Sequence, residues 1–172
     1  TDPDDAVYDV IGQILTAGRT SRLYRALVRD QRIAANASGF SGYPGDKYPN
    51  LFAFFAVPTP GHTPQEVRDG IRAEIERLKT EEVADDELKM VKTRARAGLI
   101  RRLGNNQGLA NQLGATQARY GDWRELFRQI EQIEKVGKED VKRVAQKTFL
   151  ESNRTVAILE STRLAGAPKG GN

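Results

Sequence analysis

The residues with the clearest chemical potential are four arginines that recur within residues 19–43. If this stretch is helical, the helical period places Arg22, Arg25, Arg29 and Arg32 on one face. Arg22 and Arg29 would then lie ~10 Å apart along the helix axis. Such a row of guanidinium groups could bind phosphates, carboxylates or carbonyl oxygens, although a solvated helix face is the commoner reason for an arginine stripe. The opposite face is apolar and contains Leu23 and Leu27, with Tyr24 and Val28 less central.

A strand-like pattern follows the arginines from about Ala34. Alternation places Asn36, Ser38 and Phe40 on one face and small residues on the other, where they allow another backbone to approach closely. A turn rich in proline, glycine and asparagine separates this strand from the apolar run 51–57. We therefore predict a β-hairpin whose second strand is buried on both faces, with Phe52, Phe54 and Phe55 supplying those faces.

The composition excludes several kinds of catalytic site. The chain has no cysteine and one histidine, His62, so a zinc site with the usual three protein ligands, a thiolate site and a serine protease triad all lack their residues. His62 precedes Thr63-Pro64-Gln65-Glu66, which is better explained as a helix-capping box than as a metal motif. No phosphate-binding glycine loop is present. We predict no catalytic residue, no metal ligand and no cofactor in this chain.

The charge balance does not indicate a polyanionic partner. The 172 residues include 27 Lys and Arg against 23 Asp and Glu, a net charge of +4 that is spread along the chain. A second basic region at residues 89–102 is interpreted as a solvated helix, so nucleic acid binding is not expected. The longest apolar run, residues 51–57, is too short to span a membrane. We expect a soluble chain, and both the bacterial periplasm and the cytoplasm remain possible compartments.

Periodicity and capping signals predict an α+β fold. The strongest helix start is the capping box at Thr63 with proline at the first helical position. Residues 154–159 are predicted to form a third strand because of their β-branched content. The expected architecture has two layers, a mixed or antiparallel sheet with helices packed mainly on one face. The other predicted helices cover residues 4–18, 85–103, 109–120, 122–137 and 138–149.

The same patterns predict one domain. Residues 1–162 should form it, and residues 163–172 should be a disordered tail because they lack apolar periodicity. Three strands are few for so many helices, so a further strand upstream of residue 1 is expected.

The order of these segments resembles a known family. The run S-R-L-Y-R-A-L-V-R-D-Q-R-I-A-A-N-A-S at residues 21–38 is similar to a segment of the second homologous domain of pitrilysin/insulinase metallopeptidases, which include mitochondrial processing peptidase. The resemblance continues through the Thr63 helix, the D-D-E-L start at Asp85, and the sequence V-G-K-E-D-V-K-R-V-A-Q-K-T-F-L followed by R-T-V-A-I-L-E. It covers roughly residues 5–160.

The resemblance implies a non-catalytic half-domain. In this family one domain carries H-x-x-E-H and binds zinc, and the related second domain lacks that motif and completes a peptide-binding chamber. The absence of H-x-x-E-H from this chain matches the second domain. The expected partners are a zinc-bearing catalytic domain or subunit of the same family and a peptide substrate, and a homo-oligomer is possible.

The resemblance also implies two substrate-binding residues. Arg29 stands where several members have an arginine that holds a substrate carbonyl oxygen, and Asn36 stands where they have a tyrosine. The asparagine amide can donate a hydrogen bond but is shorter and lacks the phenol. The alternative is a degenerate peptidase-like interaction domain with no proteolytic role, which Asn36 slightly favours and Arg29 disfavours.

Overall fold

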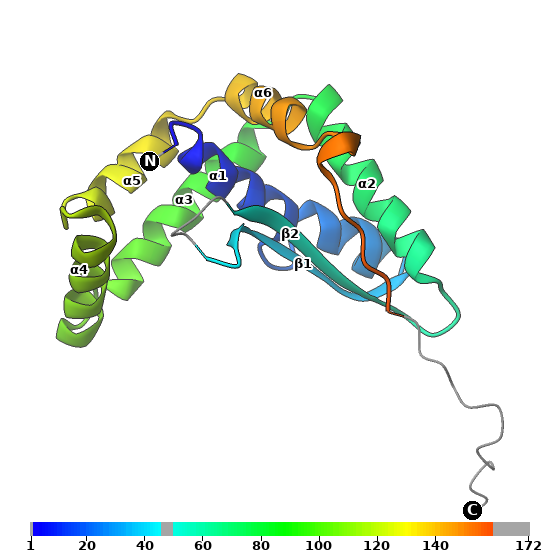
Figure 1. Cartoon of the computed structure of the whole chain (residues 1–172), viewed down its shortest axis with the longest axis horizontal. Coiled ribbons are helices and arrows are strands. Elements are labelled where there is room, and N and C mark those ends of the chain that lie inside the picture. Colours follow the sequence, from blue (N-terminus) through cyan, green and yellow to red (C-terminus); the bar gives the residue numbers. More distant parts are fainter. Residues whose placement is uncertain (1, 46–49, 160–172) are drawn as a thin grey trace, which may run out of the picture.

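The computed structural model describes residues 2–45 and 50–159 and has the predicted α+β architecture. Two antiparallel strands, β1 (Ala34–Tyr43) and β2 (Leu51–Pro58), form a hairpin. Helices pack against one face of the hairpin, so the molecule has a sheet layer and a helical layer (Figure 1). The structure confirms the hairpin, the antiparallel sheet and the one-sided arrangement of helices.

Helices form most of the described chain. The capping box at Thr63 is confirmed: the Thr63 hydroxyl accepts a hydrogen bond from Glu66 N, and the Glu66 carboxylate accepts one from Thr63 N. The acidic start at Asp85 also begins a helix. In chain order the helices are α1 (Asp5–Thr16), η1 (Tyr24–Asp30), α2 (Pro64–Thr80), α3 (Asp85–Arg102), α4 (Asn106–Tyr120), α5 (Glu125–Lys135), α6 (Lys138–Thr148) and the short 3-10 helix η2 (Glu151–Asn153).

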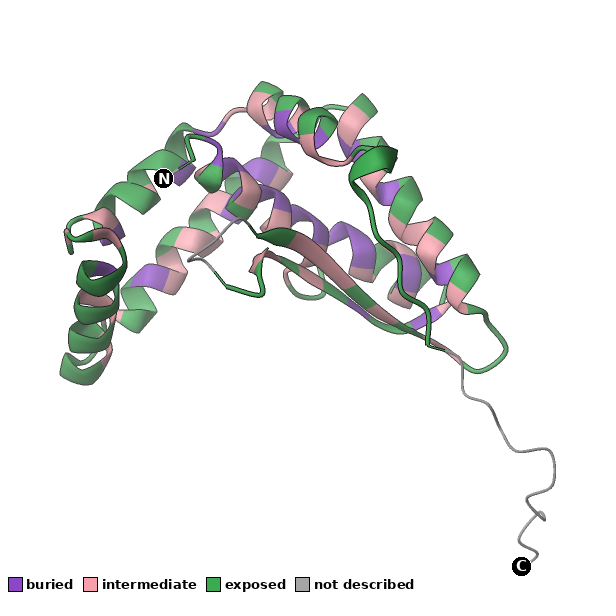
Figure 2. Ribbon diagram, viewed as in Figure 1, coloured by how far each residue is buried: buried purple, intermediate pink, exposed green. Residues whose placement is uncertain are grey.

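Helix α1 is the centre of the hydrophobic core. Its apolar positions repeat every three or four residues, and Val10, Ile11, Ile14 and Leu15 are almost completely buried (Figure 2). This helix contacts β1, α3, α5 and α6, so it joins the two layers. Burying each such side chain stabilises the fold by about 1.5–3 kcal/mol.

A close approach between α1 and the hairpin explains the small residues of β1. The Thr16 hydroxyl donates to the carbonyl oxygens of Gly12 and Gly39, at 2.7 Å and 2.6 Å. A Cβ atom at Gly39 would lie 3.0 Å from the Thr16 methyl carbon of α1, 2.7 Å from the Ala53 oxygen and 2.8 Å from a ring carbon of Phe54. The predicted need for a small residue on this face is therefore confirmed.

The predicted burial of β2 on both faces is wrong. Phe52, Phe54 and Ala56 point to the core, whereas Phe55 is 48% exposed and Val57 is also exposed. In the described part of the chain no helix covers this second face, and a two-stranded sheet packed on one side buries only alternate residues. We call the uncovered face, with Asn36, Ser38, Phe40, Tyr43, Leu51, Phe55 and Val57, the open face.

The third predicted strand is also absent. Residues 154–159 are exposed and form no ladder with the hairpin, although their β-branched content suits a strand. A strand requires a neighbour for its backbone groups, and sequence propensity cannot supply one. The predicted tail, residues 163–172, lies outside the described residues. In residues 2–45 and 50–159 no helix is long and apolar enough to cross a membrane.

Candidate functional site

The arginine segment is a π-helix, not the α-helix that the sequence predicts. In η1 the Gln31 N–H bonds to the Ala26 oxygen, five residues earlier, at 3.0 Å. This wider helix turns less per residue than an α-helix, so a wheel built on the α-helical period misplaces its side chains. Leu23 and Leu27 are fully buried and hold the segment on the core, which confirms the predicted apolar face.

The four arginines have different environments and do not form one solvated face. Arg22 is only 8% exposed, whereas the Arg29 side chain is 60% exposed. Arg32 lies beyond the helix, with a left-handed φ of 57°. The predicted row of four guanidinium groups is therefore wrong, because Arg22 precedes the π-helix and is buried against Glu87, and Arg32 follows the helix with a left-handed backbone.

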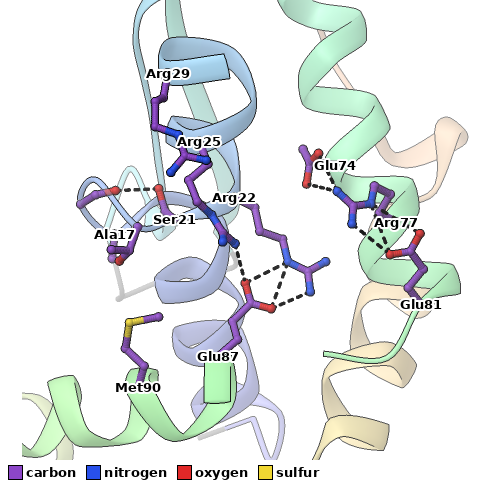
Figure 3. A network of polar contacts seen from close by, with 12 residues as sticks. Ala17, Ser21, Arg22, Arg25, Arg29, Glu74, Arg77, Glu81, Glu87 and Met90 are labelled. Atoms are coloured by element: carbon purple, nitrogen blue, oxygen red, sulfur yellow. Dashed lines mark hydrogen bonds and ion pairs between the residues drawn. The ribbon is translucent and has the colours of Figure 1, made fainter. Parts of the chain in front are cut away.

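Arg22 instead has a structural partner that sequence reasoning missed. Its guanidinium donates to the Glu87 carboxylate at 2.7, 3.0 and 3.3 Å, and the Glu87 side chain is 12% exposed (Figure 3). Glu87 lies in the first turn of α3, where the helix dipole also stabilises a carboxylate. Arg25 approaches the same carboxylate at 3.6 Å. This cluster fastens η1 to α3, and it leaves Arg29 as the arginine of η1 that faces solvent without a buried partner.

Arg29 lies at the exposed end of η1 and is paired with its neighbour. Its Nε and Nη2 groups donate to the two carboxylate oxygens of Asp30 at 2.6 Å and 3.1 Å. The hydrogen bonds with Asp30 raise the pKa of Arg29, and those with Arg29 lower the pKa of Asp30. A guanidinium has five N–H donors, so Asp30 leaves three that can bind an incoming carbonyl oxygen.

Asn36 lies on the open face of β1, opposite Val57 in the hairpin. In the described part of the chain its side-chain amide makes no hydrogen bond, so both its donors and its acceptor are accessible. A register irregularity between Ala34 and Asn36 precedes it. Arg29 and Asn36 therefore come from successive elements that pack together, η1 and β1, but they do not hydrogen-bond to each other.

An aromatic cluster on the open face was not identified from the sequence. Phe40 and Phe55 stack with their ring centroids 5.9 Å apart, and Tyr43 packs edge-on against both at about 6 Å. The alternation that places Phe40 beside Asn36 and Ser38 was the available signal. The exposure of this face was not recognised, because the apolar run of β2 that pairs with β1 is typical of a strand buried on both faces.

The residues near His62 serve the helix start. His62 Nδ1 lies 3.5 Å from a Glu66 carboxylate oxygen, and that carboxylate caps α2. Backbone and hydroxyl groups of Thr63 lower the pKa of Glu66. Within residues 2–45 and 50–159 no three His, Cys, Asp or Glu residues are grouped so that they could hold a metal ion.

Sequence and structure comparisons place these features in a family. Residues 1–95 match the family described as the peptidase M16 inactive domain. No protein of curated function matches the chain in sequence.

Several solved structures are similar over most of the chain. A candidate zinc protease from Bordetella pertussis Tohama I is 28% identical, with 90% of this chain and 83% of that chain covered and a TM-score of 0.76. The inactive peptidase domain of a candidate zinc protease from Bordetella parapertussis is 27% identical, with 90% and 82% covered and a TM-score of 0.78. A protease from Helicobacter pylori is 25% identical with a TM-score of 0.81, and 89% of this chain covers 36% of that chain. With the family match spanning more than half of its residues, the chain belongs to the family of peptidase M16 inactive domains.

Proposed function

We propose that this chain is the non-catalytic domain of a zinc metalloendopeptidase and that it completes a peptide-binding chamber for a zinc-bearing domain or subunit. The observation that carries the proposal is the open face of the hairpin. Helices cover one side of the sheet, and the other side presents apolar rings together with a free amide and a hydroxyl group. A mixed apolar and polar wall of this kind suits an extended peptide, whose side chains and carbonyl groups alternate along its length.

Arg29 and Asn36 are the residues that we propose contact the substrate. Both are exposed, and both carry N–H donors suited to peptide carbonyl oxygens. Asp30 orients the Arg29 guanidinium and leaves donors free, which limits the rotamer entropy lost on binding. The zinc and the attacking water belong to the partner in this proposal, and this chain contributes binding and positioning.

The competing function is an interaction domain with no proteolytic role. Two observations favour it: Asn36 has a shorter side chain than tyrosine, and Arg29 is already paired with Asp30. The two functions differ in what the open face touches while the assembled protease works.

Photo-crosslinking distinguishes them. A photoreactive residue at Ser38 on the open face is compared with one at Gln65, which is exposed on α2 in the helical layer. In the protease assembled from this domain and its zinc-bearing partner, we expect a peptide substrate to crosslink to position 38 and not to position 65. An active assembly in which position 38 never labels the peptide would exclude the chamber role.

A further inference from the structure

A groove in the helical layer is separate from the open face. It is lined only by residues of α1, α3 and α5 and has a volume of about 450 Å³. Its apolar lining includes Val10 of α1, Val91 and Leu99 of α3, and Leu126 and Ile133 of α5. These five side chains are buried at the base of the groove. Ala95 of α3 and Ile130 of α5 also line it and are only partly buried, so they offer apolar surface to a ligand.

The rim of the groove carries arginines of α3 with unequal roles. The Arg94 guanidinium is already hydrogen-bonded within the protein, because it donates to the Ala17 carbonyl oxygen at 2.8 Å and to the Thr20 hydroxyl at 2.9 Å. Arg101 and Arg102 also line the groove, and in the described part of the chain neither guanidinium has an ion pair or hydrogen bond. The acidic residue in the lining, Asp9 of α1, accepts a hydrogen bond from the Ser41 hydroxyl at 3.4 Å.

The Arg102 guanidinium lies over a glycine of the groove lining. Its Nη1 atom lies 3.5 Å from the position that a Cβ would take on Gly98, one turn earlier in α3. Arginines in the last turn of a helix interact favourably with the helix dipole, but that role does not require a guanidinium folded back over a glycine. The result is an apolar floor with two uncompensated positive charges at one end.

We propose that this groove binds an amphipathic helix of a partner protein that carries acidic residues at one end. A groove between packed helices receives the apolar face of another helix through residues at i, i+3, i+4 and i+7. Charge complementarity explains why the partner helix should be acidic at one end, because its carboxylates would pair with Arg101 and Arg102. This inference does not depend on peptide binding at the open face, since the groove residues all come from α1, α3 and α5.

The test uses a fluorescent helical peptide of ~15 residues, hydrocarbon-stapled because short helices are marginal in water. It has leucines at i, i+3, i+4 and i+7 and glutamates at one end, and a second peptide has lysines in place of the glutamates. We expect the acidic peptide to bind the full chain saturably by fluorescence anisotropy and the lysine peptide to bind at least ~10-fold more weakly.

Two changes to the groove separate its shape from its charge. Gly98→Leu fills the groove without altering charge and replaces glycine with a better helix former, and Arg101→Glu with Arg102→Glu reverses the rim. Each should weaken the acidic peptide roughly 10-fold or more, and the reversed rim should improve binding of the lysine peptide. Arg96→Glu is the matched control, because Arg96 is an exposed arginine of α3 outside the groove lining, and it should leave the affinity within about twofold.

Thermal melts establish that each variant is folded before binding is compared. Equal binding of the two peptides, no saturable binding of either, or unchanged affinity in folded Gly98→Leu would overturn the proposal. Equal losses from Arg96→Glu and from the rim reversal would do the same, because they would indicate nonspecific attraction to a basic helix.

Discussion

Arg22 and Glu87 form a nearly buried ion pair that joins two elements 65 residues apart in sequence. The Arg22 Nη1 atom is buried and has no hydrogen-bond partner in the described structure, so the pair is not fully satisfied. Removing one partner of a buried pair leaves an uncompensated charge, whereas replacing both with apolar residues is often neutral. The pair therefore explains the position of η1 but does not guarantee a net gain in stability.

Glu87→Ala should destabilise the fold by ~3–5 kcal/mol, because it leaves the Arg22 charge buried alone. The double variant Arg22→Met with Glu87→Leu should recover most of that loss. Urea denaturation of Glu87→Ala and the parent measures the loss, and the addition of Arg22→Met, Glu87→Leu and their combination gives the coupling energy. A loss below ~1 kcal/mol in Glu87→Ala would mean that water reaches the pair in solution.

Gly39→Ala should destabilise the fold by ~1–3 kcal/mol, because its Cβ would meet the backbone of β2 and not only a flexible side chain. Gly114→Ala is the opposite control. Nothing lies within 4 Å of a Cβ at Gly114, which is inside α4, so that change should stabilise the helix by up to ~1 kcal/mol. Chemical denaturation midpoints that shift in the same direction for both variants would contradict the close backbone contact at Gly39.

Phe54→Ala and Phe55→Ala should differ, although the sequence predicts that both residues are buried. Phe54 packs on the core and stacks with Phe52 at a centroid distance of 4.8 Å, so its loss should approach the ~3–5 kcal/mol of a buried phenylalanine. Phe55 lies on the open face and should cost less than ~1.5 kcal/mol, the scale of an exposed aromatic pair. Equal shifts in the urea midpoint would indicate that the open face is covered in solution.

Local signals in the sequence predicted the elements better than their environments. The capping box at Thr63, the acidic start at Asp85 and the alternation of β1 depend on neighbouring residues, and each was predicted correctly. The π-helical winding of η1 and the pairing of Arg22 with Glu87 depend on tertiary contacts between distant segments. No local pattern encodes such contacts, which is why the four arginines were predicted to share one face although Arg22 is buried.

The same limit applies to the strands. Apolar runs such as residues 51–57 show that a segment can be buried, but whether one or both faces are covered depends on what packs there. The segment at 154–159 has strand propensity without a partner in the described structure. The two predicted site residues, Arg29 and Asn36, are exposed, and their contact with substrate stays a prediction.

Acid should weaken the link between α1 and α6 that Asp4 makes. The Asp4 side chain is almost buried and accepts hydrogen bonds from Arg143 and Lys147, and these bonds lower the pKa of Asp4. A carboxyl group whose pKa is lower in the folded state contributes stability above its unfolded pKa of about 4, and this contribution is lost as the pH falls through the folded pKa. Stability should therefore fall more steeply below about pH 4 in the parent than in Asp4→Asn.

Urea denaturation at several pH values between neutrality and acid tests this. At neutral pH Asp4→Asn should lose about 1 kcal/mol, since its two partners are more than half exposed. Glu139→Gln is the control, because Glu139 is exposed on α6 and has no ion pair in the described structure. If the free energy of unfolding falls with pH at the same rate in the parent and in Asp4→Asn, Asp4 does not cause the acid sensitivity.

Arg29→Lys should lower peptide turnover by roughly 10- to 100-fold in the protease assembled with the zinc-bearing partner. Lysine keeps the charge but cannot reproduce the planar fork that would bind a carbonyl oxygen while Asp30 holds its other edge. The matched control is Arg68→Lys, because Arg68 on α2 pairs with the adjacent Asp69 at 2.9 Å and 3.2 Å in the same way. That control should leave turnover unchanged, and neither variant should measurably shift the urea midpoint, because both arginines are on the surface.

Asn36→Tyr gives the complementary measurement. If the amide makes a weakened version of the tyrosine contact that we propose for this position, a phenol at this exposed position should raise turnover. Because the two side chains would act on one peptide, the effects of Arg29→Lys and Asn36→Tyr on turnover should not be additive. Comparison of kcat/KM for the parent, the two single variants and the double variant measures this coupling. A silent Arg29→Lys together with no gain from Asn36→Tyr, in an assembly that still cleaves peptide, would move the substrate contact away from these residues and favour the interaction-domain function.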